Sequence, residues 1–289
     1  MNPSGAKTFK AALASLHFGE EPPLVGDRGS GTFFLSGCNL RCPFCQNWQI
    51  SRGLIGKELT IDEGAEICLK LQEAGAANVN FVTGSHSIPQ LIEVIKRARE
   101  LGLTLPILWN SSAFEKIELL EQLAPHVDIW LPDLKTTEAR WAQEIYGREI
   151  YAERARKAVK FMIAQSPLVY TEGGMLTKGT IIRHLIIPGY PEITEELIEW
   201  FAQKGKDRAL LSLLSQYTPV HIPGETHPIP ERYVSEEEYE RVIAMLEKYA
   251  IDDGFIQELE TGSDWLPDFR EAEPFSADLS RVIWKSPSP

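Results

Sequence analysis

Short apolar runs alternate with longer amphipathic segments along this chain. The runs are rich in β-branched and aromatic residues and predict strands. We expect strands at residues 32–35, 78–82, 105–109, 127–131, 180–187 and 209–214. The segments between them repeat apolar residues at helical spacing. We expect helices at residues 61–74, 88–101, 114–123, 149–164, 194–204 and 235–249.

Regular alternation of strand and helix favours an α/β protein whose parallel sheet is wrapped by helices. Thr60 followed by Glu63, and Ser235 followed by Glu238, have the spacing of helix capping boxes and support two of the helix starts. Six strand–helix units fit a partial TIM-type barrel, (β/α)6, better than a closed barrel of eight. The fold predicted is therefore an open barrel with extensions at both ends.

Both ends of the chain lack clear periodicity. We expect residues 1–30 to be an irregular N-terminal lead-in, residues 31–255 to be the barrel, and residues 256–289 to be a C-terminal tail. Prolines punctuate the tail, yet it also holds aromatic residues, which disordered segments usually lack. We expect the tail to pack on the barrel or on a partner.

The overall charge and hydropathy exclude several function classes. A formal net charge of −12 argues against nucleic acid as a partner, because binding along phosphates needs clustered Lys and Arg. The chain has no apolar run near the roughly 20 residues that span a bilayer, and residues 1–19 lack the pattern of a signal peptide. We expect no membrane association and a cytoplasmic location.

The sharpest chemical signal is a group of cysteines directly after the first expected strand. Cys38, Cys42 and Cys45 have the spacing C-x3-C-x2-C. Three thiolates on one loop hold three irons of a cubane cluster and leave the fourth iron open. A structural zinc site or a ferredoxin cluster would need a fourth ligand, and the remaining Cys68 lies in an expected helix, where a lone cysteine is usually a buried hydrophobe.

At these residues the sequence resembles the radical S-adenosylmethionine (SAM) superfamily, whose cysteine loop follows the first strand of a partial (β/α)6 barrel. Within it, FFLSGCNLRCPFCQN at residues 33–47 and HFGEEPPL at residues 17–24 are similar to the pyruvate formate-lyase activating enzyme-like subfamily. The resemblance implies a [4Fe-4S] cluster on Cys38, Cys42 and Cys45 and bound SAM. It also implies reductive cleavage of SAM to a 5′-deoxyadenosyl radical that abstracts hydrogen from a substrate.

The resemblance also implies cofactor-binding residues. Phe44 and Asn47 match positions near the adenine, and Asn110 and Ser112 match positions near the ribose and the methionine carboxylate. Arg183 matches a basic residue that would clamp the SAM carboxylate. Where the family usually has Gly-Gly-Glu to hold the SAM amino group, this chain has Gly84, Ser85 and His86, with an ordinary loop histidine as the alternative for His86.

Asp133, Lys135 and His17 are the candidate catalytic residues. Asp133 and Lys135 project to the same side of an extended chain, and the resemblance places them at the active-site mouth with a candidate monovalent cation near the Asp. A simple salt bridge is the alternative. His184 points away from Arg183 and is explained equally well by packing, and Ser215, Gln216 and Tyr217 match the substrate side only weakly.

The partners implied are a low-potential electron donor such as flavodoxin or ferredoxin and a substrate, with a glycyl radical enzyme as one candidate. A second hypothesis is a radical SAM enzyme acting on a small molecule or a peptide. A tail folded over the barrel mouth would favour a small molecule, and an open mouth would accommodate a peptide loop. A remote alternative is a non-catalytic iron-sulfur electron-transfer protein, which the open fourth ligand position disfavours.

Overall fold

The computed structural model describes residues 7–225, 230–259, 261–263 and 265–287. Residues 1–6 of the expected lead-in and residues 260, 264, 288 and 289 of the expected tail lie outside the described residues. The expected strands are present as β2 (Ser30–Leu35), β4 (Val79–Val82), β5 (Ile107–Ser111), β6 (Ile129–Pro132), β8 (Leu176–Leu185) and β9 (Leu210–Leu214). These strands pair in parallel, and β10 (Gly254–Ile256) adds a further parallel strand beyond β9.

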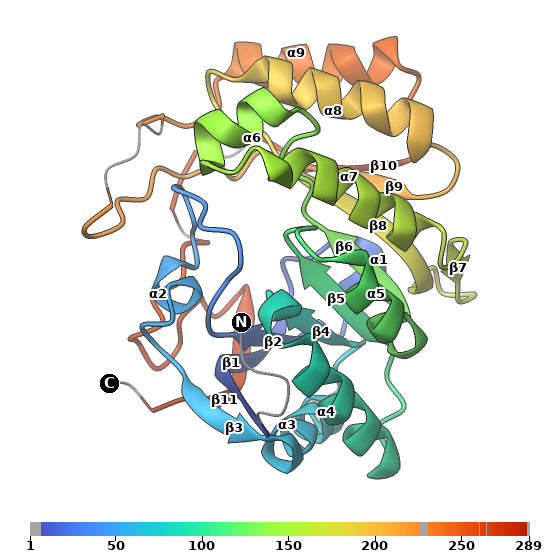
Figure 1. Ribbon diagram of the computed structural model, residues 1–289, viewed down its shortest axis with the longest axis vertical. Helices are drawn as coiled ribbons and strands as arrows, with labels where there is room; N and C mark the ends of the chain where they lie inside the picture. Colours follow the sequence, from blue (N-terminus) through green and yellow to red (C-terminus); the bar gives the residue numbers. More distant parts are fainter. Residues whose placement is uncertain (1–6, 226–229, 260, 264, 288–289) are drawn as a thin grey trace.

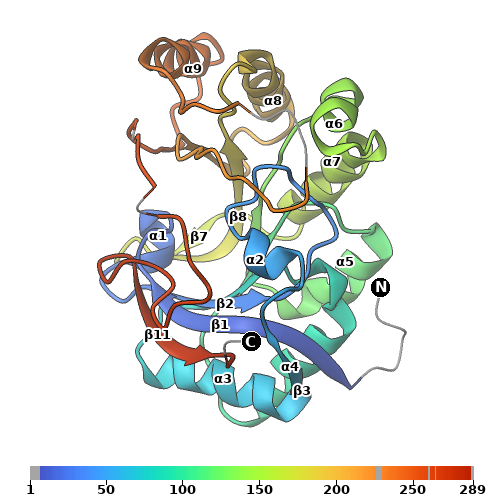
Figure 2. The ribbon, with the colours of Figure 1, turned by 90° about the vertical axis from the view of Figure 1, so that its left-hand side faces the viewer.

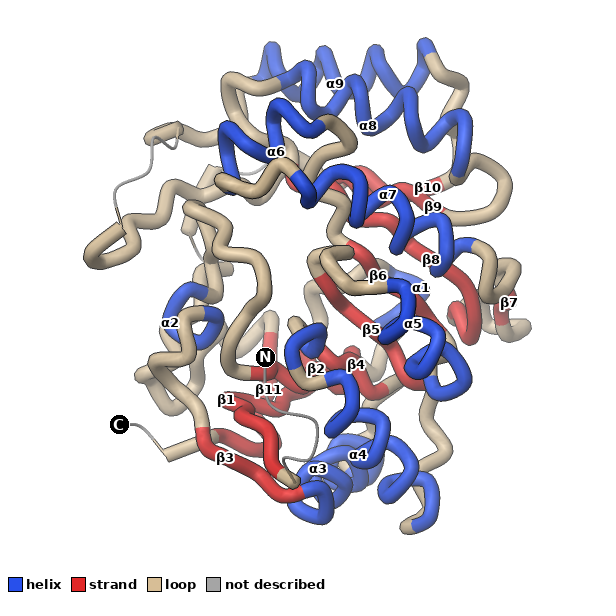
Figure 3. The backbone as a smooth tube through the Cα atoms, viewed as in Figure 1, coloured by secondary structure: helices blue, strands red, loops and turns tan. Residues whose placement is uncertain are grey.

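The expected helices lie on the outer face of this sheet (Figure 3). They are α3 (Ile61–Glu73), α4 (Ile88–Glu100), α5 (Ile117–Leu123), α7 (Ile150–Ile163), α8 (Pro191–Lys204) and α9 (Glu236–Lys248). Both predicted capping boxes are formed, at Thr60 and at Ser235. The sequence did not predict α6 (Ala139–Tyr146), nor the short helices α1 (Pro22–Val25) and α2 (Trp48–Ser51) and the 3-10 turns η1 (Gly84–His86) and η2 (Ala124–His126).

The N-terminal segment is not the irregular lead-in expected from the sequence. Strand β1 (Thr8–His17) pairs antiparallel with β2 on one side, and β3 (Lys57–Thr60) pairs antiparallel with β1 (Figure 2). Residues 11–16 of β1 are all buried, so the strand shows no alternation of apolar and polar residues. Its alanines also have low strand propensity. Both properties hide the strand from a search for period-two patterns.

The C-terminal tail packs on the barrel through a strand and through aromatic side chains. Its strand β11 (Ser280–Lys285) pairs antiparallel with β1. Phe269 and Phe275 pack against Phe34 of β2, with ring centroids 5.7 and 5.6 Å from it. A strand and aromatic contacts therefore hold the described part of the tail on the barrel.

The sheet follows the order β10, β9, β8, β6, β5, β4, β2, β1, β11, with the short β7 (Val169–Tyr170) on β8. Figure 1 shows its strongly curved path from β11 and β1 to β9 and β10. Among the described residues the two end strands do not pair with each other, so the barrel is open. The structure confirms the predicted partial TIM-type barrel.

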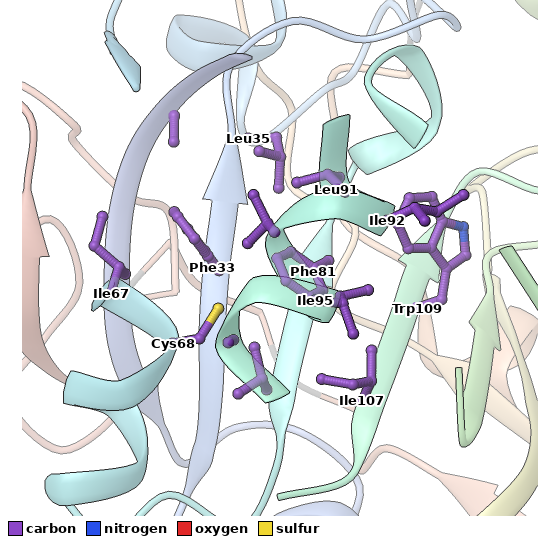
Figure 4. Packing of buried hydrophobic residues seen from close by; sticks show 14 of the residues in the cluster. Phe33, Leu35, Ile67, Cys68, Phe81, Leu91, Ile92, Ile95, Ile107 and Trp109 are labelled. Atoms are coloured by element: carbon purple, nitrogen blue, oxygen red, sulfur yellow. The ribbon is translucent and has the colours of Figure 1, made fainter. Parts of the chain in front are cut away.

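Two of the four hydrophobic clusters show how the barrel is packed on its outside and at its inner end. Outside the sheet, Cys68 of α3 is fully buried with Phe33 and Phe81, as expected for a small hydrophobe (Figure 4). Inside the barrel, Leu24 of α1 is fully buried among residues of β5, β6, β8 and β9: Leu108, Ile129, Leu131, Leu176, Ile181 and Leu210. Helix α1 therefore fills the N-terminal end of the barrel.

Within the part of the chain that the structure describes, no helix is both long and apolar enough to cross a membrane.

Candidate cluster and cofactor site

A cavity of about 740 Å³ occupies the barrel above α1. Because strand side chains alternate, Asn110, Asp133, Arg183 and Ser212 point into it from four neighbouring strands or their ends. The carboxyl ends of barrel strands are where such enzymes place their active sites. Most of the predicted site residues line this cavity: His17, Cys38, Cys42, Phe44, Cys45, Asn47, Asn110, Ser112, Asp133, Lys135 and Arg183.

The cysteine loop between β2 and α2 is anchored to two other strand ends. The Asn39 side chain donates to the carbonyl of Phe114, at 3.0 Å, beyond the end of β5. The Gln46 side chain donates to the carbonyl of Gln216, at 2.8 Å, beyond the end of β9. Hydrogen bonds at both of its ends fix the loop across the barrel opening.

Arg52 supports the same loop from α2. Its guanidinium donates to the Cys42 carbonyl at 3.0 Å and forms a forked ion pair with Glu225 at 2.7 and 2.8 Å. Burial raises the pKa of the Cys38 thiol to about 11, and the neighbouring Cys45 adds to the shift. Burial also raises the pKa of Cys42. A metal would therefore have to displace protons from thiols that are otherwise neutral.

These three thiols fit a cubane cluster better than a single ion. In the described ranges, no three His, Cys, Asp or Glu side chains converge closely enough to hold one metal ion. A cubane places each thiolate on a different iron, so its ligands surround a cube instead of a point. Cys38, Cys42 and Cys45 share one loop and one cavity wall and influence one another electrostatically.

The turn after β4 is placed differently from the expectation. None of Gly84, Ser85 and His86 lines the cavity. The Ser85 hydroxyl donates to the buried carboxylate of Glu115 at 2.5 Å. Gly84 lies tight against Trp109, where a Cβ would come within 2.5 Å of the ring. This packing turns the whole segment away from the cavity.

His86 instead supports the start of the cysteine loop through a hydrogen bond. Its Nε2 lies 3.0 Å from the Ser36 carbonyl, to which it donates. Gly37 adopts a φ of +104°, and a Cβ there would meet the same ring nitrogen at 3.0 Å. The alternative of a hydrogen-bonded loop histidine describes His86 better than direct cofactor binding.

Two residues near strand ends have strained backbone conformations, and the sequence analysis did not single them out. Thr83 has a φ of +62° and lines the cavity directly after β4. Ala113, with a φ of +56°, follows Ser112 at the end of β5. Positive φ is rare for a β-branched residue, and such strain is concentrated at functional sites. No sequence signal shows it, because φ depends on the surrounding packing.

The remaining residues that were predicted to contact the cofactor line the cavity. Phe44 is nearly buried and packs on Tyr217, with ring centroids 5.4 Å apart. Asn47 is the N-cap residue of α2, but its side-chain amide makes no capping hydrogen bond. Asn110 and Ser112 line the wall from β5 and its end. Their side chains offer donors and acceptors to a polar ligand.

Asp133 and Lys135 form an ion pair in the cavity wall, with Nζ 2.8 Å from the carboxylate. Burial opposes the charge of Lys135, but Asp133 and the nearby cysteines raise its pKa above the ordinary value. The Tyr151 hydroxyl accepts from the Lys135 backbone and donates to the Ser112 carbonyl, both at 2.9 Å. Asp133 and Lys135 therefore form a salt bridge with each other and also line the cavity.

Arg183 is engaged by residues that the sequence analysis did not select. Its guanidinium forks onto Glu21 at 2.7 and 2.6 Å and also pairs with Glu20. Burial favours protonation of Glu21, yet Arg183 holds its pKa below the usual range. The Nε and one terminal nitrogen of Arg183 are thus engaged by Glu21, whereas the expected clamp on a SAM carboxylate stays a prediction.

His17 and His184, the other two histidines considered in the sequence analysis, lie in different environments. His17 lines the cavity and packs against Phe275, with ring centroids 5.2 Å apart, and burial lowers its pKa. His184 is buried outside the cavity, with Nδ1 2.9 Å from the Leu134 carbonyl and Nε2 3.0 Å from the Thr194 hydroxyl. His184 thus has the packing role that the sequence allowed. Of the weak match at Ser215, Gln216 and Tyr217, only Gln216 lines the cavity.

The comparisons with known proteins agree with this architecture. The profile of the radical SAM superfamily matches residues 32–201. The uncharacterized protein MJ0674 of Methanocaldococcus jannaschii is 32% identical over 246 residues, which cover 82% of this chain and 67% of that protein.

Two crystal structures share the fold at low identity. SuiB of Streptococcus suis, bound to the precursor peptide SuiA, aligns with a TM-score of 0.54 and 16% identity over 77% of this chain and 46% of that chain. This chain thus spans about half the length of SuiB. A radical SAM methyltransferase from Sphaerobacter thermophilus aligns with a TM-score of 0.54 and 15% identity over 79% of this chain and 66% of that one. From its cysteine loop, its open barrel and the match over most of that barrel, this chain belongs to the radical SAM superfamily.

Proposed function

We propose that this protein is a radical SAM enzyme that holds a [4Fe-4S] cluster on Cys38, Cys42 and Cys45. When bound, the cluster and SAM supply reductive cleavage of SAM to a 5′-deoxyadenosyl radical, which abstracts hydrogen from a substrate. The observation that carries the proposal is the cysteine loop, whose three thiols line the same cavity as most of the other predicted cofactor residues: Phe44, Asn47, Asn110, Ser112 and Arg183.

The residues of the chain have separable tasks in this proposal. The cysteine loop is fixed by hydrogen bonds from Asn39, Gln46 and Arg52. These bonds would hold the three thiols in place to bind the cluster. Lys135 is buried beside the cysteines and compensates the negative charge of bound thiolates. The ion pair already satisfies Asp133, so the proposal needs no monovalent cation there. An electron donor such as flavodoxin or ferredoxin would complete the reaction.

For the substrate, the walls of the cavity favour a small molecule or one side chain of a peptide. Trp265, Pro267, Phe275 and Leu279 of the tail line the cavity together with barrel residues. A tail in this position narrows the space that a folded protein loop would enter. Activation of a glycyl radical enzyme is supported only by the resemblance at residues 17–24 and 33–47.

The test is anaerobic reconstitution with iron and sulfide, reduction, addition of SAM and measurement of 5′-deoxyadenosine. We expect product from the wild type and none from a variant with Cys38, Cys42 and Cys45 changed to Ala. Cys68→Ala is the matched control, because this cysteine is buried in another core. A wild type that assembles a cluster but never cleaves SAM would leave the electron-transfer alternative in its place.

A further inference from the structure

The deep end of the cavity, next to α1, carries excess negative charge. Glu20, Glu21 and Arg183 line it, and their side chains are only 7%, 4% and 12% exposed. Across the whole described lining, the carboxylates are Glu20, Glu21 and Asp133 and the cations are Lys135 and Arg183. One carboxylate therefore has no cation of its own in this cavity.

The contacts identify that carboxylate as Glu20. Arg183 commits Nε and one terminal nitrogen to the fork with Glu21, and only this terminal nitrogen also reaches Glu20. Asp133 is paired with Lys135. The Asn80 side chain is the other group that supports Glu20, donating from its amide at 3.0 Å. Both oxygens of Glu20 thus accept a hydrogen bond, but Glu20 and Glu21 share the single cation Arg183, so the buried group keeps one negative charge without a counter-charge.

An unpaired acceptor lies beside it. Asn80 is fully buried, and its Oδ1 has no hydrogen-bond partner. Asn80 does not itself line the cavity; it lies behind Glu20, to which its amide donates, and the alternation of β4 directs its side chain to the same side as Val82 of the lining. His17 lines the same cavity, and its Nδ1 is likewise buried without a partner. Buried acceptors in folded proteins are normally paired, so an orphan here calls for a donor from a ligand.

We propose that this acidic floor, made of Glu20, Glu21, Asn80 and Arg183, binds a protonated amine of the substrate. An ammonium group supplies the missing positive charge and donates to both Glu20 and the free Asn80 oxygen. The walls above the floor are largely apolar and fit the alkyl part of such a molecule: Phe34, Leu185, Leu214, Phe255 and Trp265. The inference rests on the proposed function only in that the substrate enters this same cavity.

The experiment compares three probes of equal chain length on the reconstituted, reduced protein with SAM: hexylamine, 1-hexanol and hexanoate. Dissociation constants are measured by saturation-transfer NMR titration. We expect hexylamine to bind about tenfold more tightly than 1-hexanol, as for a charge-assisted hydrogen bond replacing a neutral one. Hexanoate should bind most weakly.

Two variants and a control make the result specific. Glu20→Gln keeps the size of the side chain and should remove the amine preference while 1-hexanol binds as before. Glu20→Asp keeps the charge and should retain much of the preference. Glu115→Gln is the matched control, since Glu115 is a buried carboxylate outside the cavity lining.

The outcomes separate this inference from the proposed function. Equal binding of hexylamine and 1-hexanol, or an unchanged preference in Glu20→Gln, overturns the acidic floor even if 5′-deoxyadenosine is formed. Weaker SAM binding in Glu20→Gln with no change for hexylamine also overturns it, because the floor would then serve SAM. Amine preference without SAM cleavage supports the floor and contradicts the proposed function.

Discussion

At the scale of single residues, burial decides which histidines carry charge. His184 is fully buried between a carbonyl and a hydroxyl, and burial lowers its pKa to about 4. The neutral ring is therefore the form that the fold stabilises. Its hydrogen bonds join the end of β6 to α8, so it stabilises the wall that carries Asp133 and Lys135 without facing the cavity.

This predicts a specific pH dependence of stability. A histidine whose pKa is lowered by folding stabilises the protein fully above its unfolded pKa of about 6.5, and the contribution is lost as the pH falls toward 4. We expect His184 to cost the wild type about 2 kcal/mol of unfolding free energy between pH 7 and pH 5.

Urea denaturation of wild type and His184→Gln at both pH values measures this difference. The gap in stability between the two proteins should shrink as the pH falls. His221→Gln, at an exposed position, is the control and should follow the wild type. Parallel pH profiles for wild type and His184→Gln would show that the ring does not titrate as the burial implies.

Gly37 is a second residue whose role depends on backbone geometry. Its φ of +104° and the closeness of the His86 ring both disfavour a side chain. We expect Gly37→Ala to displace the start of the cysteine loop and reduce the iron bound per chain by about half or more, as strain of roughly 1–3 kcal/mol would do.

Gly53→Ala separates the two causes, because Gly53 also has positive φ but no atom within 4 Å of its Cβ position. Iron content measured after identical reconstitution should be near the wild-type value for this control. Full iron binding by Gly37→Ala would contradict the role of the Gly37–His86 contact.

The sequence predicted some site residues better than others, because some depend on local spacing and others on contacts between distant parts of the chain. Cys38, Cys42 and Cys45 are found because their ligand spacing is local to one loop. Arg183 was assigned to SAM by the family resemblance, and its contact with Glu21 was missed because the two residues lie 162 positions apart and no local pattern shows such a contact. Glu20 and Glu21 were visible only as part of a lead-in motif.

At the scale of elements, the predictable strands and helices are those with a clear period. The parallel strands and the amphipathic helices around them follow the sequence within a few residues. Strand β1 pairs with β2 and β11 at its edges, and residues 11–16 are buried on both faces, so the strand has no apolar–polar alternation to find. Strand β11 depends on β1 for pairing, and hence neither could be predicted alone.

The tail should contribute substantially to stability through Phe269. This ring is 1% exposed and packs on Phe34 and Phe275. We expect Phe269→Ala to lower the unfolding free energy by about 3–5 kcal/mol, as for other buried phenylalanines. Phe18→Ala, at a position 39% exposed, should cost below about 1 kcal/mol.

Chemical denaturation of both variants gives the comparison. Similar, small losses in the two proteins would mean that the tail is not part of the cooperative fold. In that case the cavity would lack the wall that Trp265 and Phe275 provide.

At the scale of the whole molecule, both chain ends complete the barrel. The segment after β1 fills one end of the barrel with α1 and supplies Glu20 and Glu21, and the tail adds apolar residues to the cavity. The sheet itself stays open, and its cavity is enclosed by α1 and the tail, which lie outside the βα repeat. The cysteine loop lies across the other end, held by strands on opposite sides.

The central claim is that three cysteines leave one iron open for SAM in this chamber. Electron paramagnetic resonance of the reduced, reconstituted protein, recorded with and without SAM, tests it most directly. We predict a [4Fe-4S] signal whose g-values change on addition of SAM and saturate near one SAM per cluster, because a new ligand alters the electronic structure of the iron it binds. A spectrum unchanged at saturating SAM would contradict the claim and assign the cluster to electron transfer.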